Sequence, residues 1–314
     1  MTLLEVQDLN VRFPAGDGMV HASRDVSFSL DAGEVLGLVG ETGSGKSVIG
    51  QAVIRLLPSN AEVTGAIIFD GRELTSLSEH AMHTLRGRSI SLVPQNPSGS
   101  LDPITRNGNQ IAEIFTGIGR KKSEAWIKAN VLLAAVGLIP TEEIAKEYPH
   151  QLSGGMRQRL TTSIAIAEHP RLIIADEPTK GLDFRARETT SKVLSGIRTR
   201  EQASLLLITH DLFLAEQLCG RIAVVYAGEI VEIAPACKIF TKPEHPYTRA
   251  LIQAIPKNGL IPLTGQSPSL MDIPEGCSFT DRCPFSSEIC RMKHPDLVKD
   301  MINGGVRCHH PFSN

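Results

Sequence analysis

The chain has 314 residues, of which 41% are hydrophobic and 21% charged, a balance typical of globular proteins that excludes a disordered, fibrous or peptide-sized chain. Its formal net charge is −2 and only 4% of its residues are aromatic, so it lacks the basic field and the stacking rings that nucleic-acid binding uses. No apolar segment approaches the roughly 18 residues of a membrane-spanning helix. We expect one large domain with a smaller appendage.

The first 75 residues are rich in strand patterns. Apolar and polar residues alternate over 4–11, and further strand patterns occur at 26–30 and 66–69. Residues 35–39 are Val-Leu-Gly-Leu-Val, a short and wholly apolar segment that is typical of a strand buried on both faces. The acidic N-terminus does not resemble a secretory signal. These residues predict a sheet with a buried central strand.

From about residue 78 to residue 168 the apolar spacing becomes mostly helical. The clearest segment is 123–136, in which Trp126, Ile127, Val131, Leu132 and Val136 follow one another at helical spacing. A short strand pattern at 90–93 interrupts this region. We therefore predict a helical insertion between two parts of the sheet.

Strand and helix patterns alternate after this insertion. Strands are predicted at 172–175, 204–209 and 221–226, with helix-length segments at 184–201 and 211–218 between them. Alternation of this kind predicts parallel strands with helices against the sheet. After about residue 235 the chain is richer in proline, glycine and cysteine and loses its periodicity, which indicates a small extension.

A glycine-rich loop directly follows the buried strand 35–39. It matches the pattern G-x-x-x-x-G-K-[ST], and a helix pattern over 48–57 comes next. Glycines allow the backbone to present several N–H groups to phosphate at a helix N-terminus, where the helix dipole also favours anions. Lys46 is expected to contact the β- and γ-phosphates and Ser47 to hold Mg²⁺. The residues predicted to bind nucleotide are Gly40, Glu41, Thr42, Gly43, Ser44, Gly45, Lys46 and Ser47.

Two carboxylates, Asp176 and Glu177, end the apolar strand 172–175. The carboxyl end of a strand in such a sheet is where phosphates lie, so Asp176 is expected to hold Mg²⁺. Glu177 is the candidate general base for the water that attacks the γ-phosphate. Together with the loop, these residues predict ATP hydrolysis with Mg²⁺ as the cofactor.

Residues 151–159, Gln-Leu-Ser-Gly-Gly-Met-Arg-Gln-Arg, precede this acidic strand end. Leu-Ser-Gly-Gly at this place resembles the signature of ABC-transporter ATPase subunits. Ser153, Gly154 and Gly155 are expected to form a second anion site at the start of a helix over 156–167. The resemblance spans about residues 3–235, and it implies that two such subunits dimerise head to tail with each phosphate loop facing the signature of the other.

Four further positions match landmarks of this family. Gln95, which follows the strand 90–93, resembles the Q-loop glutamine that senses Mg²⁺ and water and touches the membrane subunit. Gly181-Leu182-Asp183 resembles the D-loop, although a glycine stands where the family more often has alanine. His210, which closes the strand 204–209, resembles the switch histidine that contacts the γ-phosphate. Phe13 takes the place of the aromatic residue that stacks on adenine.

The C-terminal residues indicate which branch of this family the chain resembles. His245-Pro246-Tyr247 and the segment 274–284 resemble the C-terminal extension of ATPases that serve dipeptide, oligopeptide and nickel importers. Some members of that branch hold a [4Fe–4S] cluster, which implies the same for Cys277, Cys283, Cys290 and Cys308, with zinc or free thiols as the alternatives. Cys219 and Cys237 are expected to be small buried residues, and His294, His309 and His310 to be solvated.

The predicted fold is therefore a P-loop NTPase of the ABC cassette type, with a mixed β core in residues 1–235, a helical subdomain at about 96–168, and a Cys-rich extension in 236–314. The resemblance implies an ATPase at the cytoplasmic face of the membrane. Its expected partners are two permease subunits, a second homologous ATPase in a heterodimer or homodimer, and indirectly an extracytoplasmic binding protein. Peptide uptake is the expected function, with a nickel importer or a soluble ABC ATPase acting on ribosomes or DNA as alternatives.

Overall fold

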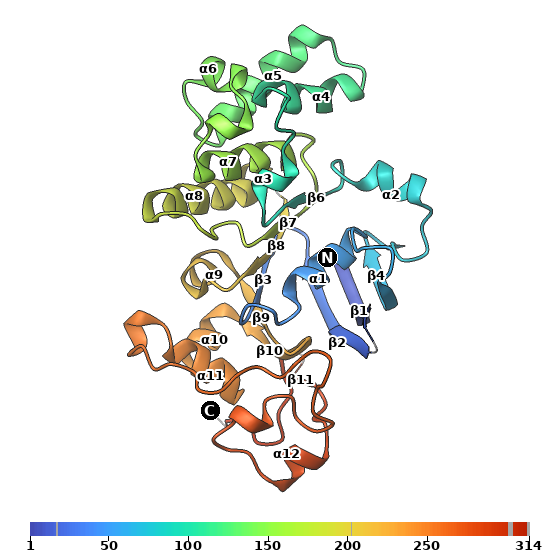
Figure 1. Ribbon diagram of the computed structural model, residues 1–314, viewed down its shortest axis with the longest axis vertical. Coiled ribbons are helices and arrows are strands. Elements are labelled where there is room, and N and C mark those ends of the chain that lie inside the picture. The colour runs from blue at the N-terminus through green and yellow to red at the C-terminus, as the bar shows by residue number, and fades with distance from the viewer. Residues whose placement is uncertain (17, 202, 301–303, 313–314) are drawn as a thin grey trace. The chain divides into compact units, whose positions relative to one another are not determined.

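The computed structural model describes residues 1–16, 18–201, 203–300 and 304–312 (Figure 1). Their contacts divide the chain into two compact units. The first unit combines residues 1–77 with 207–314, and the second comprises 78–206. The chain therefore leaves the first unit once and returns to it, and the residues after 235 belong to the first unit.

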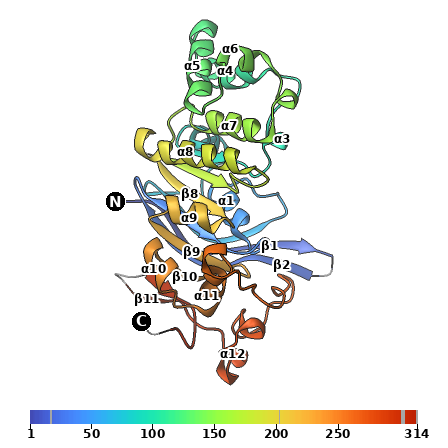
Figure 2. The ribbon, with the colours of Figure 1, turned by 90° about the vertical axis from the view of Figure 1, so that its left-hand side faces the viewer.

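A four-stranded antiparallel sheet forms the N-terminal part of the first unit. Its strands lie in the order β2 (Gly18–Asp31), β1 (Thr2–Ala15), β4 (Glu62–Phe69) and β5 (Arg72–Glu73). The long hairpin of β1 and β2 is visible in Figure 2. Val6, Leu9 and Val11 are buried, and an irregularity in the pairing between Val6 and Leu9 keeps Leu9 on the buried face. The strand predicted over residues 4–11 is confirmed.

Five further strands of the first unit lie in the order β11 (Val298–Asp300), β12 (Gly304–Val306), β10 (Glu229–Pro235), β9 (Arg221–Tyr226) and β3 (Val35–Val39). β3 and β9 are parallel, as predicted, whereas β10 is antiparallel to β9. The chain reverses between β9 and β10 through Ala227 and Gly228, whose φ angles of 47° and 82° suit a two-residue hairpin turn. The sheet of this unit is therefore mixed. Sequence patterns did not predict the strand β10.

Short helices complete the first unit. They are α1 (Lys46–Val53), α9 (Leu212–Leu218), α10 (Ala236–Thr241), α11 (Pro246–Gln253) and α12 (Glu288–Met292), with 3-10 turns at Pro256–Asn258 and Thr280–Arg282. The helix predicted over 48–57 ends at Val53, because Arg55 adopts a left-handed φ of 54°. The extension thus contains helices that the loss of periodicity after residue 235 did not predict.

The second unit is mostly helical. Its helices are α2 (Glu79–Leu85), α3 (Pro97–Ser100), α4 (Asn107–Gly117), α5 (Lys122–Ala135), α6 (Thr141–Lys146), α7 (Gly154–Ala165) and α8 (Phe184–Glu201), with a 3-10 turn at Pro149–Gln151. The helices α4, α5 and α6 pack on one another (Figure 1). β6 (Ile90–Val93) and β7 (Leu172–Asp176) pair in parallel, as predicted. β8 (Ser204–Thr209) begins in this unit and ends in the first.

The helix α5 confirms the helix predicted from apolar spacing, and its buried face consists mainly of other residues. Ala125, Ala129 and Leu133, spaced four residues apart, are buried on one side of α5. Ile127 and Val131 are instead 64% and 62% exposed. Small alanines therefore form much of the packed face, whereas Ile127 and Val131, two of the apolar residues from which the helix was predicted, lie on the surface.

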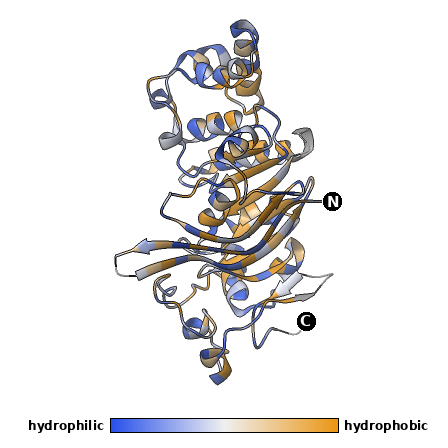
Figure 3. Cartoon of the chain, turned by 90° about the vertical axis from the view of Figure 1, so that its right-hand side faces the viewer, coloured by the Kyte–Doolittle hydropathy of each residue, from blue (hydrophilic) through white to orange (hydrophobic). Residues whose placement is uncertain are grey.

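Apolar residues concentrate in the strands. Figure 3 colours the central strands mostly as hydrophobic and the helices in both colours, which is the pattern of amphipathic helices beside buried strands. Every residue of β3 and of β7 is buried. Within the described parts of the chain, no helix has both the length and the apolar character needed to cross a membrane.

Candidate functional site

The phosphate loop lies between the buried strand β3 and helix α1, as predicted. Gly40 and Gly45 have φ angles of 155° and 96°. A Cβ atom on Gly40 would lie 2.1 Å from the carbonyl oxygen of Val225, and one on Gly45 would lie 2.1 Å from that of Ala22. Both positions therefore require glycine, because the loop backbone passes directly against neighbouring strands.

Lys46 is buried, and its side chain lies against the loop backbone. Its ammonium group donates to the carbonyl oxygens of Gly40 at 2.9 Å and Glu41 at 2.7 Å, and to Ser44 Oγ at 3.3 Å. No side chain caps the start of α1, where Gly45 is the preceding residue. The loop therefore presents a positive charge together with a helix N-terminus that its own side chains leave uncapped, which is the arrangement that binds phosphate.

Glu41 is held by residues of the C-terminal extension. Arg282 donates two hydrogen bonds of 2.9 Å to the Glu41 carboxylate, and Ser267 donates a third of 2.6 Å. The Glu41 N–H donates to the hydroxyl of Tyr247 at 3.0 Å. Burial would raise the pKa of Glu41, but the hydrogen bonds from Arg282 and Ser267 and the charges of Arg282 and Lys46 lower it below its usual value. Sequence patterns did not predict any of these contacts.

His210 and Phe13 also belong to the first unit. His210 is exposed directly after β8, and the next residue, Asp211, caps α9 by accepting from the N–H groups of Phe213 and Leu214. Phe13 is half-buried in β1 opposite Val20 of β2. Phe13 therefore lies within a strand and His210 in the bend between β8 and α9, and their roles toward a nucleotide stay predictions.

The second unit contains the acidic strand end. Asp176 is the last residue of β7, and both it and Glu177 are buried. Glu177 has a φ of 48°, so the backbone leaves the strand at that residue. Gln95 follows β6 and is exposed. Adjacent buried carboxylates at the end of one strand are suited to holding a cation and a water molecule.

The signature residues form the start of α7. Ser153 caps this helix, since its Oγ accepts from the N–H of Met156 at 3.2 Å. Ser153 and Gly154 are exposed, whereas a Cβ on Gly155 would lie 2.9 Å from the Cβ of Ala186, which is on α8. Asp183 caps α8 by accepting from the Ala186 N–H at 2.8 Å. The structure therefore brings the signature and the D-loop together inside the second unit.

The loop between β3 and α1 defines the chain as a P-loop nucleotide-binding protein, because a buried strand, glycines with special φ angles and an uncapped helix start occur in one segment. Comparison with known proteins identifies the family more specifically than the loop does. Residues 23–180 match the family model described as "ABC transporter", and residues 231–290 match "Oligopeptide/dipeptide transporter, C-terminal region". The chain therefore belongs to the ABC transporter family, as an ATP-binding protein with that C-terminal region.

Several curated relatives are similar over almost the whole chain. The "Probable peptide ABC transporter ATP-binding protein y4tR" of Sinorhizobium fredii is 41% identical over 98% of this chain and 94% of that protein. The "Oligopeptide transport ATP-binding protein OppD" of Escherichia coli is 39% identical over 98% and 93%. The "Dipeptide transport ATP-binding protein DppD" of Bacillus subtilis is 40% identical over 98% and 94%. Members of this family hydrolyse ATP, and the chain is an ABC-type ATPase.

A solved structure shares the fold. The ATP-binding cassette MJ0796, in a dimeric post-hydrolysis state bound to ADP and Pi, matches with a TM-score of 0.67 and 24% identity. The match covers 74% of this chain and 99% of that one. The predicted ABC cassette fold is therefore confirmed.

The structure brings the four cysteines of the extension together but does not support a [4Fe–4S] cluster. Cys277, Cys283, Cys290 and Cys308 line one cavity of about 10 Å³, which has room for about one water molecule. Burial raises the pKa of Cys277 to about 12 and that of Cys308 to about 11. Among the described residues, no three or more His, Cys, Asp or Glu side chains form a group that could hold a metal ion. The structure therefore supports neither the cluster nor zinc.

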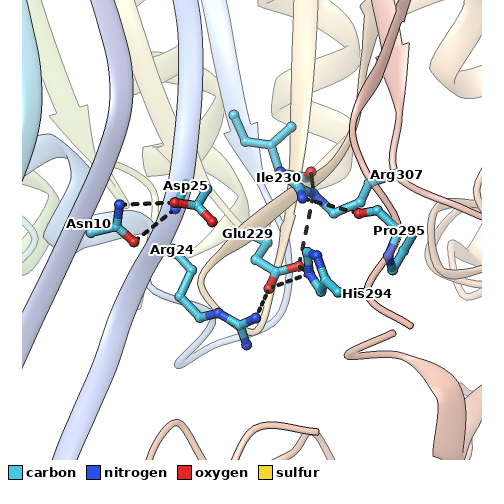
Figure 4. A network of polar contacts seen from close by, with 8 residues as sticks. All are labelled: Asn10, Arg24, Asp25, Glu229, Ile230, His294, Pro295 and Arg307. Carbon is cyan, nitrogen blue, oxygen red and sulfur yellow. Dashed lines mark hydrogen bonds and ion pairs between the residues drawn. The ribbon is translucent and has the colours of Figure 1, made fainter. Parts of the chain in front are cut away.

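Two further expectations about the tail need correction. Cys219 is buried, as expected, but Cys237 is exposed. His294 is not simply solvated: its Nε2 lies 3.0 Å from both carboxylate oxygens of the buried Glu229, which also pairs with Arg24 at 2.8 Å (Figure 4). Arg307 extends this network by donating to the carbonyl oxygen of Ile230 at 3.2 Å. Charged groups therefore tie the tail to β10 and β2 within the first unit.

Proposed function

We propose that this chain is the ATP-hydrolysing subunit of an importer that takes up dipeptides or oligopeptides. The observation that carries this proposal is the likeness to peptide-transport ATP-binding proteins over 98% of the chain, which includes the extension. A nickel importer and a soluble ABC ATPase acting on ribosomes or DNA, the alternatives from sequence, have no comparable support among these relatives. Peptide uptake is thus the best-supported function.

The nucleotide site is proposed residue by residue from the loop and the matching landmarks. The loop N–H groups and Lys46 bind the phosphates. Ser47, Gln95 and Asp176 are the proposed Mg²⁺ ligands, and their oxygen donors are the kind that this ion prefers. Phe13 is the proposed stacking partner of adenine. Bound Mg²⁺ neutralises charge on the phosphates.

Hydrolysis needs a water molecule activated beside the γ-phosphate. We assign Glu177 as the general base, because it is a buried carboxylate at the carboxyl end of β7, directly after the proposed magnesium ligand Asp176. His210 is proposed to orient that water and to stabilise the transferring phosphoryl group. Catalysis then consists of positioning and charge neutralisation, which is what phosphoryl transfer requires of a protein.

The signature is proposed to act on the nucleotide of a second ATPase subunit. Ser153 and Gly154 are exposed at the start of α7, so another molecule can reach this helix N-terminus. Asp183 of the D-loop is proposed to take part in the same contact. The second subunit is a related ATPase in a heterodimer, and a homodimer is the alternative.

The membrane partners are two permease subunits at the cytoplasmic face, and the cargo reaches them from an extracytoplasmic binding protein. The second unit supports such docking, since it exposes large apolar side chains: Ile104 is 84% exposed and lies in the segment that follows Gln95. Exposed apolar residues of this size are typical of surfaces that bind another protein. The chain is therefore proposed to be a peripheral membrane protein.

Substitution of the proposed base tests the catalytic assignment. Glu177→Gln should still bind Mg-ATP but hydrolyse it at least about 100-fold more slowly, because a general base contributes about 10²–10⁴-fold. Mixed with its partner ATPase, the protein should accumulate as an ATP-bound dimer, which light scattering after size exclusion would detect. Glu188→Gln, an exposed position on α8, is the matched control and should behave as the wild type. Near-normal hydrolysis by the Glu177 variant would remove Glu177 from this role.

Transport assays test the cargo. Cells that lack the chain should lose uptake of labelled dipeptides or oligopeptides and regain it with the wild type but not with Glu177→Gln. Uptake of Ni²⁺ should be unaffected. Loss of nickel uptake with normal peptide uptake would favour the alternative, and co-purification with ribosomes or DNA in place of permeases would contradict an importer.

A further inference from the structure

We propose that Arg282, in the C-terminal extension, is a positioning residue of the nucleotide site: it fixes Glu41 in the phosphate loop and neutralises its charge. This inference rests on the proposed ATP-binding function. It makes the extension a functional part of the phosphate site.

The pairing of Arg282 with Glu41 is bidentate and partly shielded from water. Both hydrogen bonds measure 2.9 Å, and the side chains of Arg282 and Glu41 are 5% and 28% exposed. The two residues lie 241 positions apart in the sequence. A planar guanidinium that binds both carboxylate oxygens fixes the direction of the carboxylate as well as its charge.

Arg282 is itself held by several other residues. Its Nε donates to the carbonyl oxygen of Thr264 at 3.0 Å, and its Nη1 donates to Ser267 at 3.1 Å and to the hydroxyl of Tyr226 at 3.3 Å. The guanidinium also lies 5.9 Å from the ring centroid of Phe279. Because its orientation is fixed before it meets Glu41, little side-chain freedom is lost in forming the pair.

Glu41 is restrained at each of its polar groups. Its carboxylate binds Arg282 and Ser267, its N–H donates to Tyr247, and its carbonyl oxygen accepts from Lys46. Tyr247 is completely buried, so the hydroxyl that accepts this hydrogen bond is rigidly placed. The extension thus controls the backbone at the second position of the loop, next to the lysine that is proposed to bind phosphate.

The charge of Glu41 makes this control necessary. A carboxylate in a loop that binds a triphosphate repels the ligand, and the repulsion is strong where water is partly excluded. Arg282 offsets that charge, and its hydrogen bonds to Glu41 together with its positive charge help to lower the pKa of Glu41 despite burial, which keeps the pair ionised. Loss of Arg282 alone would leave a negative charge beside the phosphates, whereas loss of both partners would not.

A double-mutant cycle separates these cases. The dissociation constant of Mg-ATP is measured by calorimetry for the wild type, Arg282→Gln, Glu41→Gln and the double variant. Arg282→Gln should raise the Kd about tenfold or more, since removing the cation of a partly buried pair leaves the Glu41 charge without its guanidinium partner. Glu41→Gln should raise the Kd less, and the double variant should resemble Glu41→Gln. In steady-state ATPase assays Arg282→Gln should raise KM while kcat changes by less than about threefold.

His294→Gln is the matched control, because His294 also joins the extension to a buried carboxylate, Glu229, but does not touch the phosphate loop (Figure 4). It should lower the melting temperature and leave the Kd within twofold of the wild type. Arg282→Lys keeps the charge with fewer hydrogen bonds, and it tests the pairing if Arg282→Gln does not fold. Its Kd should lie between those of the wild type and Arg282→Gln.

The outcomes are distinct. A wild type that does not bind Mg-ATP would overturn the proposed function and this inference with it. A wild type that binds, together with Arg282 variants whose Kd stays within twofold of it, would overturn the role of Arg282 alone. A double variant no better than Arg282→Gln, or a His294 variant equally weakened in ATP binding, would show that the extension acts only through general stability.

Discussion

The two glycine-rich helix starts of this protein differ in how they are built. At α1 the preceding residue is Gly45, no side chain caps the helix, and Ser44 and Lys46 are buried. At α7 the serine of the signature, Ser153, caps the helix with its own side chain and is exposed. Ser44 and Lys46 at the first helix start are buried within their unit, whereas the serine that caps the second is open to solvent.

This difference indicates different partners for the two helix starts. The phosphate loop is braced by residues of the extension, as the contacts of Glu41 with Arg282 and Tyr247 demonstrate. A braced loop with an uncapped helix start can enclose an anion with little rearrangement. The signature is stable as it stands because Ser153 satisfies the Met156 N–H. Its exposure suits a ligand held by another molecule.

Substitution of Gly45 should have the largest effect on unfolding free energy or on Mg-ATP affinity. Gly45→Ala places a Cβ 2.1 Å from the carbonyl oxygen of Ala22 at a φ of 96°, so either the loop or β2 must move. We expect a loss of more than about 3 kcal/mol in unfolding free energy, or an intact fold with Mg-ATP affinity reduced more than about 100-fold. Urea unfolding and calorimetry measure the two quantities.

Gly43→Ala is the comparison for Gly45→Ala. Gly43 has a φ of 84° but open space around its would-be Cβ, so only backbone strain of about 1–2 kcal/mol is expected. Its effect should therefore be clearly smaller. Equal effects at the two positions would mean that the close contact with Ala22 does not constrain the loop.

An intermediate effect is expected at the signature. Ser153→Asp keeps a good helix cap but adds a negative charge where a second subunit's phosphate is proposed to bind, whereas Ser153→Ala removes the cap and adds no charge. The Ser153→Asp variant should have an unfolding free energy within about 0.5 kcal/mol of the wild type and hydrolyse ATP about 100-fold more slowly. The Ser153→Ala variant should lose about 1 kcal/mol of unfolding free energy and hydrolyse ATP about tenfold more slowly. Thermal unfolding and steady-state ATPase rates give both readouts.

The order of the two Ser153 variants is the informative result. If Ser153 served only as a cap, hydrolysis would follow stability and the alanine variant would be the slower enzyme. That order would contradict a phosphate-binding role for the signature and would leave Ser153 with a structural role only.

The smallest effect concerns a third helix start, that of α11, where the buried His245 accepts from the N–H of Tyr247 at 3.0 Å. Burial lowers the pKa of His245 to about 3 from an ordinary value of 6.5. As the pH falls below 6.5 the unfolded chain therefore binds a proton that the folded chain does not, and stability decreases by up to about 1.4 kcal/mol per pH unit.

His245→Asn keeps a capping oxygen and removes this titration. Between pH 7 and pH 5 the wild type should lose about 1–2 kcal/mol more unfolding free energy than the variant does, as urea unfolding at both pH values would measure. Glu232, which accepts from the His245 N–H and whose pKa burial raises, is present in both proteins, so the difference isolates His245. Parallel pH profiles would contradict a buried neutral histidine.

Local patterns predicted much of the fold. The bounds of β6, β8 and β9, and those of α8, agree with the sequence, because each is a continuous segment of one periodicity between turn residues. β10 was missed since it follows β9 after only two residues, Ala227 and Gly228. Periodicity did not reveal that Ala125 and Ala129 lie on the buried face of α5 while Ile127 and Val131 are exposed, because packing against other helices decides which face is buried.

The sequence by itself determined the phosphate loop, the acidic strand end and the signature, because each lies within a few consecutive residues whose types carry the chemistry. Tertiary structure alone decided that Arg282 meets Glu41, that His294 pairs with Glu229, and that four cysteines line one small cavity. Such contacts join residues far apart in the chain. They depend on how the extension packs, and no short pattern encodes that packing.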